Sequence, residues 1–271
     1  MKQEQQQFGP WTLITGANSG IGAAFADILA SEGYNLVLVG RQEKAAQQTA
    51  DKIAQKHQVK TRAVIIDLSM DDFLQQFSDQ TSDLGIGLLV SNAGDDAMGA
   101  LFRVELAKLK QMLHLNTTSH LELVHHFSRR FEKRGNGGIL LVSSTAALQG
   151  TPFLGNYAGS KFYQLNLGMA LNYKMRKTGV NVTVLLPGPT KTPGLIDKPA
   201  IPLAKLPAPQ MNPDAVAKIG LHALAKNNPN VISGVANMIM SGIGSLLGRT
   251  GERNMWGGLL QGIVPRELRV R

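Results

Sequence analysis

Short apolar runs alternate along this chain with longer amphipathic segments. The runs are rich in β-branched residues, and most are apolar throughout, which is typical of strands covered on both faces. They span residues 11–15, 35–40, 62–67, 86–92, 138–144, 181–187 and 230–234. Because consecutive parallel strands need a crossover helix, the alternation predicts a parallel sheet with helices on both sides. We therefore expect an α/β fold with a doubly wound sheet.

Two of the intervening segments carry signals for the start or end of a helix. Residues 21–33 have apolar side chains at helical spacing and finish in Gly33, a typical helix stop. Ser69 is a candidate N-cap for the next but one helix, with Asp72 three residues later in the manner of a capping box.

The 271 residues suit one large α/β domain or two small ones. No repeat or linker divides the chain, so we expect a single domain over residues 1–271. Residues 1–10 are polar and Gln-rich and predict a flexible tail. The Pro-rich stretch 189–213 predicts a mobile substrate loop near the site, and residues 235–271 form a C-terminal extension.

The charge and the cysteine content indicate which kinds of partner and which compartment to expect. The net charge is +9, but Lys and Arg are scattered and only 6% of residues are aromatic, so we expect no nucleic-acid partner. A basic surface fits attraction for a phosphorylated small molecule. The chain has no cysteine, which fits a reducing compartment, and we expect a cytoplasmic protein without a metal site.

Residues 227–248 carry no charge and are long enough to span a membrane. Their Asn, Pro and Gly content argues against a spanning helix. A strand at 230–234 followed by an apolar helix is the preferred interpretation, and a peripheral membrane contact stays open as an alternative.

The first predicted strand leads directly into "TGANSGIG", residues 15–22, and then into a helix. Gly16, Gly20 and Gly22 allow a tight turn and let a pyrophosphate approach the helix N-terminus, where free N–H groups favour anions. A glycine-rich turn alone is a weak signal. Its place between a strand and an amphipathic helix makes a dinucleotide site the better interpretation.

The end of the second strand bears on the choice of dinucleotide. A carboxylate there would bind the adenosine ribose of NAD, but this chain has Gly40 followed by Arg41. Arg can hold a 2′-phosphate through charge-assisted hydrogen bonds, so we predict NADP(H) in preference to NAD(H). Asp67, at the end of the third strand, is a candidate acceptor for the adenine amino group. A solvated Arg and an Asp leading into a helix are the alternatives.

Tyr157 and Lys161 lie four residues apart in a helical segment and therefore share a face. Lowering the pKa of a Tyr from about 10 to near neutrality requires about 4 kcal/mol. A positive charge about 4 Å away supplies on the order of 4 kcal/mol at an effective dielectric of about 20. We therefore expect Lys161 to lower the pKa of Tyr157. Ser144 follows a predicted strand, where its hydroxyl could hold a substrate oxygen. Alone, a Tyr–Lys pair is also common on helix surfaces.

Taken together, these motifs resemble the short-chain dehydrogenase/reductase family. "TGANSGIG", "SNAG" (91–94), Asn116 in "HLNTTS", Ser144, "YAGSK" (157–161) and "PGPTKT" (187–192) occur in the family's order and spacing. The resemblance covers roughly residues 10–235. It implies a Rossmann-type sheet of about seven strands and hydride transfer between nicotinamide and a carbonyl or alcohol.

The resemblance also implies residue roles. Tyr157 would be the acid–base, Lys161 would lower its pKa and bind the nicotinamide ribose, and Ser144 would orient the carbonyl. Asn116 would hold a water that links Lys161 to solvent. In addition to Tyr157 and Lys161, the implied cofactor-binding set is Thr15, Gly16, Asn18, Ser19, Gly20, Ile21, Gly22, Arg41, Asp67, Leu68, Asn92, Ala93, Gly94, Pro187, Gly188, Thr190 and Thr192.

Two residues depart from the family pattern. Ser91 stands where the family often has Asn, and we expect altered hydrogen bonds between central strands. Gly159 stands where Ala is usual and should soften its helix slightly. Neither position carries a reacting group.

The substrate is specified only as a carbonyl or alcohol, with an apolar or lipid-like one preferred. The candidate pocket walls are Leu195, Ile196, Met238, Ile239, Met240, Leu246 and Leu247. A 3-oxoacyl thioester and a steroid- or retinoid-type ketone are the specific alternatives. An NADPH-binding redox sensor without turnover is an alternative of another class. The resemblance further implies a homodimer or homotetramer that pairs through helices around 105–132 and 156–177.

Overall fold

The computed structural model describes residues 8–196, 209–266 and 269. Seven parallel strands form one sheet in the order β3-β2-β1-β4-β5-β6-β7. The strands are β1 (Trp11–Thr15), β2 (Asn35–Gly40), β3 (Thr61–Ile65), β4 (Ile86–Ser91), β5 (Gly137–Val142), β6 (Val180–Leu186) and β7 (Asn230–Ile232). This confirms the predicted doubly wound α/β fold, with strand ends shifted by up to two residues.

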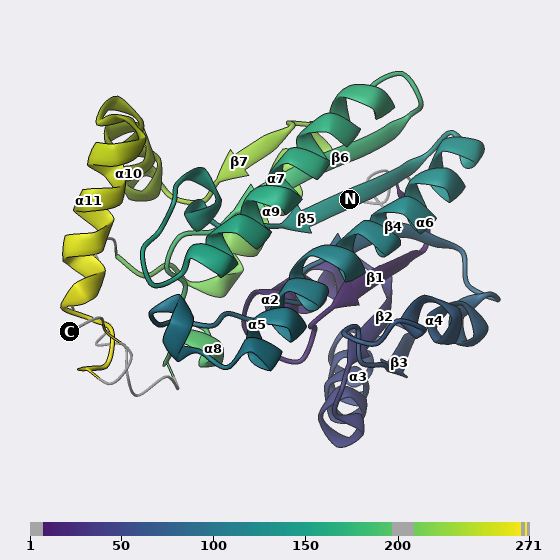
Figure 1. Cartoon of the computed structure of the whole chain (residues 1–271). Helices are drawn as coiled ribbons and strands as arrows, with labels where there is room; N and C mark the ends of the chain where they lie inside the picture. The colour runs from purple at the N-terminus through teal and green to yellow at the C-terminus, as the bar shows by residue number, and fades with distance from the viewer. Residues whose placement is uncertain (1–7, 197–208, 267–268, 270–271) are drawn as a thin grey trace.

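Helices cover both faces of the sheet, as Figure 1 shows. One layer holds α2 (Gly20–Ser31), α3 (Glu43–His57) and α9 (Pro213–Ala225), and the other holds α4 (Phe73–Thr81), α6 (Ser119–Arg134) and α7 (Gly155–Met175). The shorter elements are α5 (Leu106–Leu113), α8 (Pro193–Ile196), the 3-10 turns η1 (Leu101–Arg103) and η3 (Thr145–Leu148), and the π-helical turn η2 (His114–Thr118).

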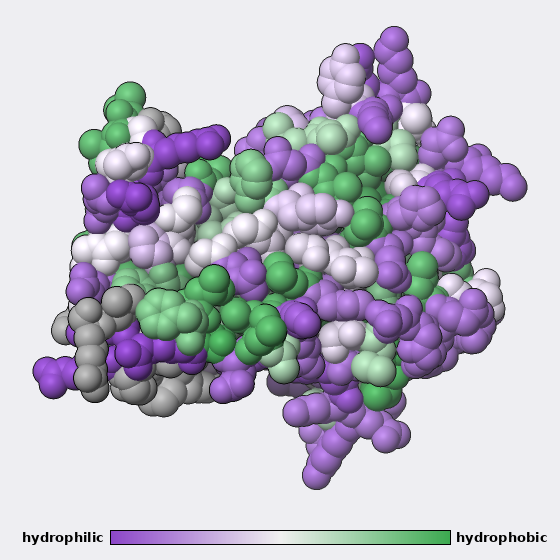
Figure 2. Space-filling view, in the orientation of Figure 1, coloured by the Kyte–Doolittle hydropathy of each residue, from purple (hydrophilic) through white to green (hydrophobic). Residues whose placement is uncertain are grey.

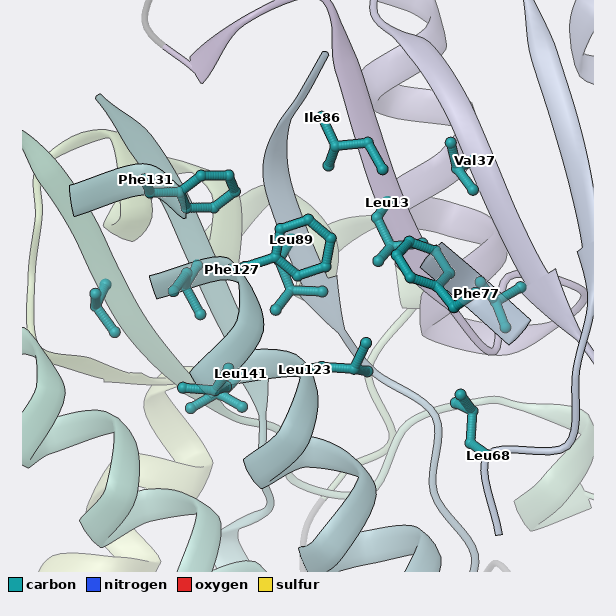
Figure 3. Packing of buried hydrophobic residues seen from close by; sticks show 14 of the residues in the cluster. Leu13, Val37, Leu68, Phe77, Ile86, Leu89, Leu123, Phe127, Phe131 and Leu141 are labelled. Carbon is teal, nitrogen blue, oxygen red and sulfur yellow. The ribbon is translucent and has the colours of Figure 1, made fainter. Parts of the chain in front are cut away.

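The two apolar cores explain why the strands carry uninterrupted apolar runs. Phe77 of α4 and Phe127 and Phe131 of α6 are buried against Leu13 and Leu89 of the central strands (Figure 3). The opposite core packs α2, α3 and α9 onto the other side chains of the same strands. Each strand therefore needs apolar residues on both faces, because neither face meets water.

The order of the strands places the candidate site. Successive strands are added to one side of β1 from β1 to β3 and to its other side from β4 onward, so the loops after β1 and β4 diverge at their carboxyl ends. This is the edge at which ligands bind in open α/β sheets. Helices α10 (Val235–Leu246) and α11 (Gly248–Gln261) lie beyond the same edge, at the left of Figure 1. They form the C-terminal extension that the sequence predicts after the strand at 230–234.

Two local expectations differ from the structure, and part of a third lies outside the described residues. Ser69 does not cap α4, because its hydroxyl donates to Asp67 Oδ1 (2.7 Å) and the helix begins at Phe73. Phe8 is buried on the sheet and the Pro10 carbonyl accepts from the Asn35 N–H, so residues 8–10 are packed and do not belong to a flexible tail. Within the proposed substrate loop, residues 197–208 lie outside the described residues.

No helix among the described residues is both long and apolar enough to cross a membrane.

Candidate active site

The glycine-rich turn between β1 and α2 is shaped for close approach. Gly16 (φ +67°) and Gly20 (φ +57°) adopt the left-handed conformation that favours glycine. A Cβ on Gly22 would collide with the Gly16 carbonyl oxygen. Asn92 braces the turn, since its Nδ2 donates to the Thr15 carbonyl (3.0 Å). The turn therefore leaves backbone exposed at the N-terminus of α2, which is the geometry that a phosphate group needs.

Thr15 and Gly22 contribute to the shape of this turn without contacting the cavity. The Thr15 hydroxyl is buried and accepts the backbone N–H groups of Asn92 and Ala93, each at 2.9 Å. Neither Thr15 nor Gly22 lines the adjoining cavity. The Asn18 side-chain oxygen is buried without a hydrogen-bond partner among the described residues. A ligand donor at that position would satisfy it, which fits a nucleotide with ribose hydroxyls.

Residues at the ends of β2 and β3 continue the cavity wall. Arg41 is exposed and lines the cavity beside Gly40, whose missing Cβ makes room for the Asn18 side chain. Leu68 lines it as well, whereas Asp67 does not. Partial burial alone would raise the pKa of Asp67, but hydrogen bonds from the hydroxyl and N–H of Ser69 and the charge of Arg41 bring that pKa below its usual value. Asp67 is therefore a carboxylate that lies next to the residues of the cavity wall but is not part of that wall.

Ser144, Tyr157 and Lys161 meet at the centre of the same cavity. Ser144 follows β5, and its hydroxyl accepts the Ala146 N–H (3.1 Å) at the start of η3. Tyr157 and Lys161 lie one turn apart in α7, with Lys161 Nζ 5.8 Å from the centre of the Tyr157 ring. The neighbouring Ser143 hydroxyl donates to the Lys161 carbonyl (2.7 Å), so Ser143 anchors the helix.

The protonation of this cluster differs from the sequence-based expectation. Burial raises the pKa of Tyr157 to about 12, a hydrogen bond from Ser144 opposes the rise, and the charge of Asp96 adds to it. Burial also lowers the pKa of Lys161 to about 7, partly offset by Asp96. The expected lowering of the Tyr157 pKa by Lys161 is therefore not found. Burying both groups costs more than the attraction between their charges returns.

Two acceptors other than the phenol hold Lys161 Nζ. Its Nζ donates to the Val142 carbonyl (3.0 Å) and to Gln164 Oε1 (3.1 Å), and the residue is almost fully buried. Within the described part of the chain, these two contacts use two of its three N–H groups. The third is available to a ligand in the cavity.

Asn116 is positioned by the π-helical turn η2 and does not line the cavity. Its side chain accepts the Asp95 N–H (3.0 Å) and donates to the Asp95 carbonyl (2.8 Å) and to the Ser160 hydroxyl (3.0 Å). Its backbone carbonyl accepts from Gln164 Nε2 (2.7 Å). Asn116 therefore ties the loop after β4 to helix α7.

The Ser91 hydroxyl bonds to a residue of α6, while the Ser91 backbone keeps its place beside Leu141 in the β4–β5 ladder. His120 of α6 is buried, and burial lowers its pKa to about 3, with Lys161 contributing. Its Nε2 lies 2.8 Å from the Ala93 carbonyl and its Nδ1 lies 2.7 Å from the Ser91 hydroxyl. Because a carbonyl only accepts, the neutral ring donates from Nε2 and accepts from Ser91. The pair supports the loop from Asn92 to Gly94.

The cavity has a volume of about 670 Å³ and two ends. The first end is lined by predicted cofactor residues: Gly16, Asn18, Ser19, Gly20, Ile21, Arg41, Leu68, Asn92, Ala93, Gly94, Pro187, Gly188, Thr190 and Thr192. The far end is lined by the predicted wall residue Met240 and by residues that the sequence did not reveal: Asp96, Met98, Gln149, Thr151, Leu154, Ser241, Trp256 and Leu260. Tyr157 and Ser144 lie where the two sets meet.

Most of the predicted substrate walls are placed elsewhere. Met240 lines the cavity, but Met238, Ile239, Leu246 and Leu247 are at least half exposed and do not line it. The side chains of Leu195 and Ile196 fall outside the described part. Trp256 and Leu260 supply the wall instead, one turn apart on α11. Their spacing on one helical face is the signal that could have identified them.

Comparisons with known proteins agree with this architecture. The short chain dehydrogenase family model matches residues 10–200. A 7beta-hydroxysteroid dehydrogenase from Clostridium sardiniense is 33% identical over 223 residues, which cover 82% of this chain and 85% of that protein. Inactive hydroxysteroid dehydrogenase-like protein 1 from Homo sapiens is 30% identical over 185 residues, 67% of this chain and 56% of that protein.

Two solved structures extend the likeness over nearly the whole fold. One comes from work on 7beta-hydroxysteroid dehydrogenase stereoselectivity and superposes with a TM-score of 0.85 at 26% identity, covering 93% of this chain and 98% of that one. The other is a short-chain dehydrogenase from Sphingobium yanoikuyae in complex with NADPH, with a TM-score of 0.77 at 26% identity over 93% of this chain and 94% of that one. The chain belongs to the short-chain dehydrogenase family and has the fold of its oxidoreductases.

Proposed function

We propose that the protein is an NADP(H)-dependent oxidoreductase that interconverts a bulky, apolar ketone and its secondary alcohol. The observation that carries this proposal is the meeting of Ser144, Tyr157 and Lys161 in one cavity with the glycine-rich turn. The cavity offers a nucleotide-shaped end and an apolar end, and the potential proton donor lies between them.

The first end fits a dinucleotide. The turn at Gly16 and Gly20 would hold the pyrophosphate, and Arg41 would pair with a 2′-phosphate. Asp67 and Leu68 would flank the adenine, Asn92, Ala93 and Gly94 the adenosine side, and Pro187, Gly188, Thr190 and Thr192 the nicotinamide carboxamide. The NADPH-bound relative from Sphingobium yanoikuyae supports the choice of cofactor. When bound, NADPH supplies the hydride.

The protein's own residues would handle the proton. A phenol with a pKa of about 12 is protonated at neutral pH, so Tyr157 carries the proton that a carbonyl oxygen would take up as hydride arrives. The Ser144 hydroxyl would hold that oxygen during transfer. Lys161 would use its remaining N–H on the ribose and, when protonated, stabilise the phenolate that transfer leaves behind. Asn116 would keep the loop and helix α7 in register around them.

The far end favours a large, mostly apolar substrate. Met98, Leu154, Met240 and Leu260 supply apolar surface. The Thr151 hydroxyl and the Trp256 indole nitrogen are buried without a hydrogen-bond partner among the described residues. Such groups fit a substrate with a second oxygen remote from its carbonyl, as in a steroid. The likeness to 7beta-hydroxysteroid dehydrogenase supports the same class.

Turnover of a ketone panel tests this proposal through the loss of NADPH absorbance. The panel contains steroid ketones, a retinoid-type ketone and a 3-oxoacyl thioester, and the steroid ketones are expected to react fastest. Tyr157→Phe should abolish turnover and leave NADPH binding intact. If the thioester reacts fastest, the substrate is a 3-oxoacyl thioester and not a steroid-like ketone.

One alternative is a protein that binds NADPH and turns nothing over. The likeness to inactive hydroxysteroid dehydrogenase-like protein 1 is the observation that favours it. The presence of Ser144, Tyr157 and Lys161 together around one cavity favours the enzyme. If the protein binds NADPH but consumes none with any compound of the panel, it is a binding protein without turnover.

The cofactor preference has a separate test. Arg41→Ala should raise KM for NADPH about tenfold or more and leave KM for NADH nearly unchanged, because only NADPH carries the 2′-phosphate. Lys52→Met, which removes an exposed charge on α3, controls for net charge. An unchanged ratio of the two KM values would contradict the assignment.

We also infer that the enzyme is a cytoplasmic homodimer or homotetramer. Phe162, Tyr163 and Tyr173 of α7 and Leu121 of α6 are exposed large apolar residues on the two helices expected to pair. On the face seen in Figure 2, pale and green residues run along these helices while strongly hydrophilic residues gather on the right. Sedimentation at several protein concentrations would reveal the assembly.

A further inference from the structure

Gln164 connects two groups of the site that the family resemblance links through a water. It is fully buried in α7, three residues after Lys161, and therefore on the same helical face. Its Oε1 accepts from Lys161 Nζ (3.1 Å) and its Nε2 donates to the Asn116 carbonyl (2.7 Å). The Gln164 amide therefore makes a direct link between the two residues that the resemblance connects through a water.

The partners fix the orientation of the amide. The Asn116 carbonyl can only accept, so the amide NH₂ must face it. A protonated Lys161 can only donate, so the amide oxygen must face the ammonium. The carboxamide is therefore complementary to the charged form of Lys161. The Val142 carbonyl (3.0 Å) supports the ammonium from the end of β5.

We propose that Gln164 is a positioning residue that replaces the expected water, fixing Lys161 Nζ in the cavity and keeping it protonated. This inference rests on the proposed function, in which Lys161 binds ribose and stabilises the Tyr157 phenolate. Gln164 acts through Lys161 and does not line the cavity. It restrains the ammonium more tightly than a mobile water, because its own backbone belongs to the same helix.

The charged and titratable groups around Lys161 come from three elements. Tyr157 lies on α7, Asp96 follows β4 and His120 lies on α6. His120 is neutral near pH 7, since burial lowers its pKa to about 3. Asp96 favours the protonated Lys161, and burial opposes it. The Gln164 oxygen is a neutral acceptor that bonds directly to the ammonium, and it thereby favours the protonated form that burial disfavours.

Two substitutions separate positioning from packing. Gln164→Leu keeps the volume and leaves both Lys161 and the Asn116 carbonyl without their partner. Gln164→Ala opens a polar space in which a water can bond to both. A packing role predicts that the Ala variant, which leaves a cavity, loses more stability and activity than the Leu variant. The positioning role predicts the opposite order for activity.

We expect Gln164→Leu to lower kcat about tenfold to hundredfold, the loss that corresponds to one hydrogen bond to a buried charge. Gln164→Ala should lose less than Gln164→Leu although it is less stable. In NMR titrations of lysine labelled at Cε, with Lys161→Met for assignment, Gln164→Leu should lower the Lys161 pKa by about one unit or more. Gln164→Ala should leave that pKa closer to wild type.

The outcomes distinguish this inference from the proposed function. The proposed function is established if the wild-type protein turns over a ketone and Tyr157→Phe abolishes that turnover. This test does not involve Gln164. An unchanged Lys161 pKa in Gln164→Leu would overturn the inference, and so would a variant series in which activity simply follows stability. The NMR titration needs no substrate, so it gives a result even if the ketone panel shows no turnover.

Discussion

The cost of burying Lys161 can be measured as a pH-dependent stability. Burial lowers its pKa from 10.5 to about 7 in the folded protein. Between these two values the unfolded chain binds more protons than the folded one, so the free energy of unfolding rises with pH through this window. Below about pH 7 the full cost of roughly 5 kcal/mol is present, and above about pH 10.5 it has disappeared.

Lys161→Met removes this titration and keeps a long unbranched side chain. Between about pH 6 and pH 9 we expect wild type to gain about 3 kcal/mol relative to the variant. The variant also loses hydrogen bonds to Val142 and Gln164, which changes its stability by an amount that does not depend on pH. The slope of the difference, rather than its size at one pH, is therefore the measured quantity.

Urea denaturation at a fixed protein concentration, followed by circular dichroism at several pH values, gives this slope. Lys52→Met removes a charge from the exposed face of α3 and should give no comparable slope. Tyr157, with a pKa of about 12, titrates above the window. A stability difference between wild type and Lys161→Met that stays flat from about pH 6 to pH 9 would refute the buried-charge account.

Three further predictions follow from buried or glycine positions. Burial lowers the pKa of His120 from 6.5 to about 3, so the unfolded chain binds an extra proton between these pH values. Acidification through this range should therefore lower the free energy of unfolding by up to about 5 kcal/mol. In acid denaturation, His120→Gln should flatten this pH dependence. Gly159→Ala should raise the urea-derived stability by about 0.5–1 kcal/mol, because its Cβ meets nothing within 4 Å; lower stability would count against it. Gly22→Ala should weaken NADPH binding about tenfold or more by NADPH fluorescence, because its Cβ collides with the Gly16 carbonyl; Gly159→Ala is the control, and equal affinities would be contrary evidence.

The sheet was predictable because its strands are buried on both faces and therefore read as continuous apolar runs. The turn at Gly16 and the shared face of Tyr157 and Lys161 follow from local geometry and were also accessible. Strand ends were less so, since the last hydrogen bonds depend on neighbouring strands. The third strand ends at Ile65, before Asp67, where the chain turns to let Ser69 bond to that carboxylate.

The electrostatics of the site could not be predicted from spacing alone. The raised pKa of Tyr157 comes from burial, which depends on how distant parts of the chain fold around it. Gln164 looks like an ordinary polar residue of a helix until η2 brings the Asn116 carbonyl against it. Trp256 reaches the cavity because α11 returns to the edge of the sheet; its spacing from Leu260 indicates a shared helical face but not what that face packs against.

The last two helices lie outside the part of the chain that the family model covers. That model ends at residue 200, whereas Met240, Trp256 and Leu260 of α10 and α11 wall the far end of the cavity. Selection can therefore remodel this appendage without touching α7 or the sheet beneath it. Exchanging the segment after Gly234 between related enzymes is a direct route to chimeras with new substrate ranges and an inherited cofactor.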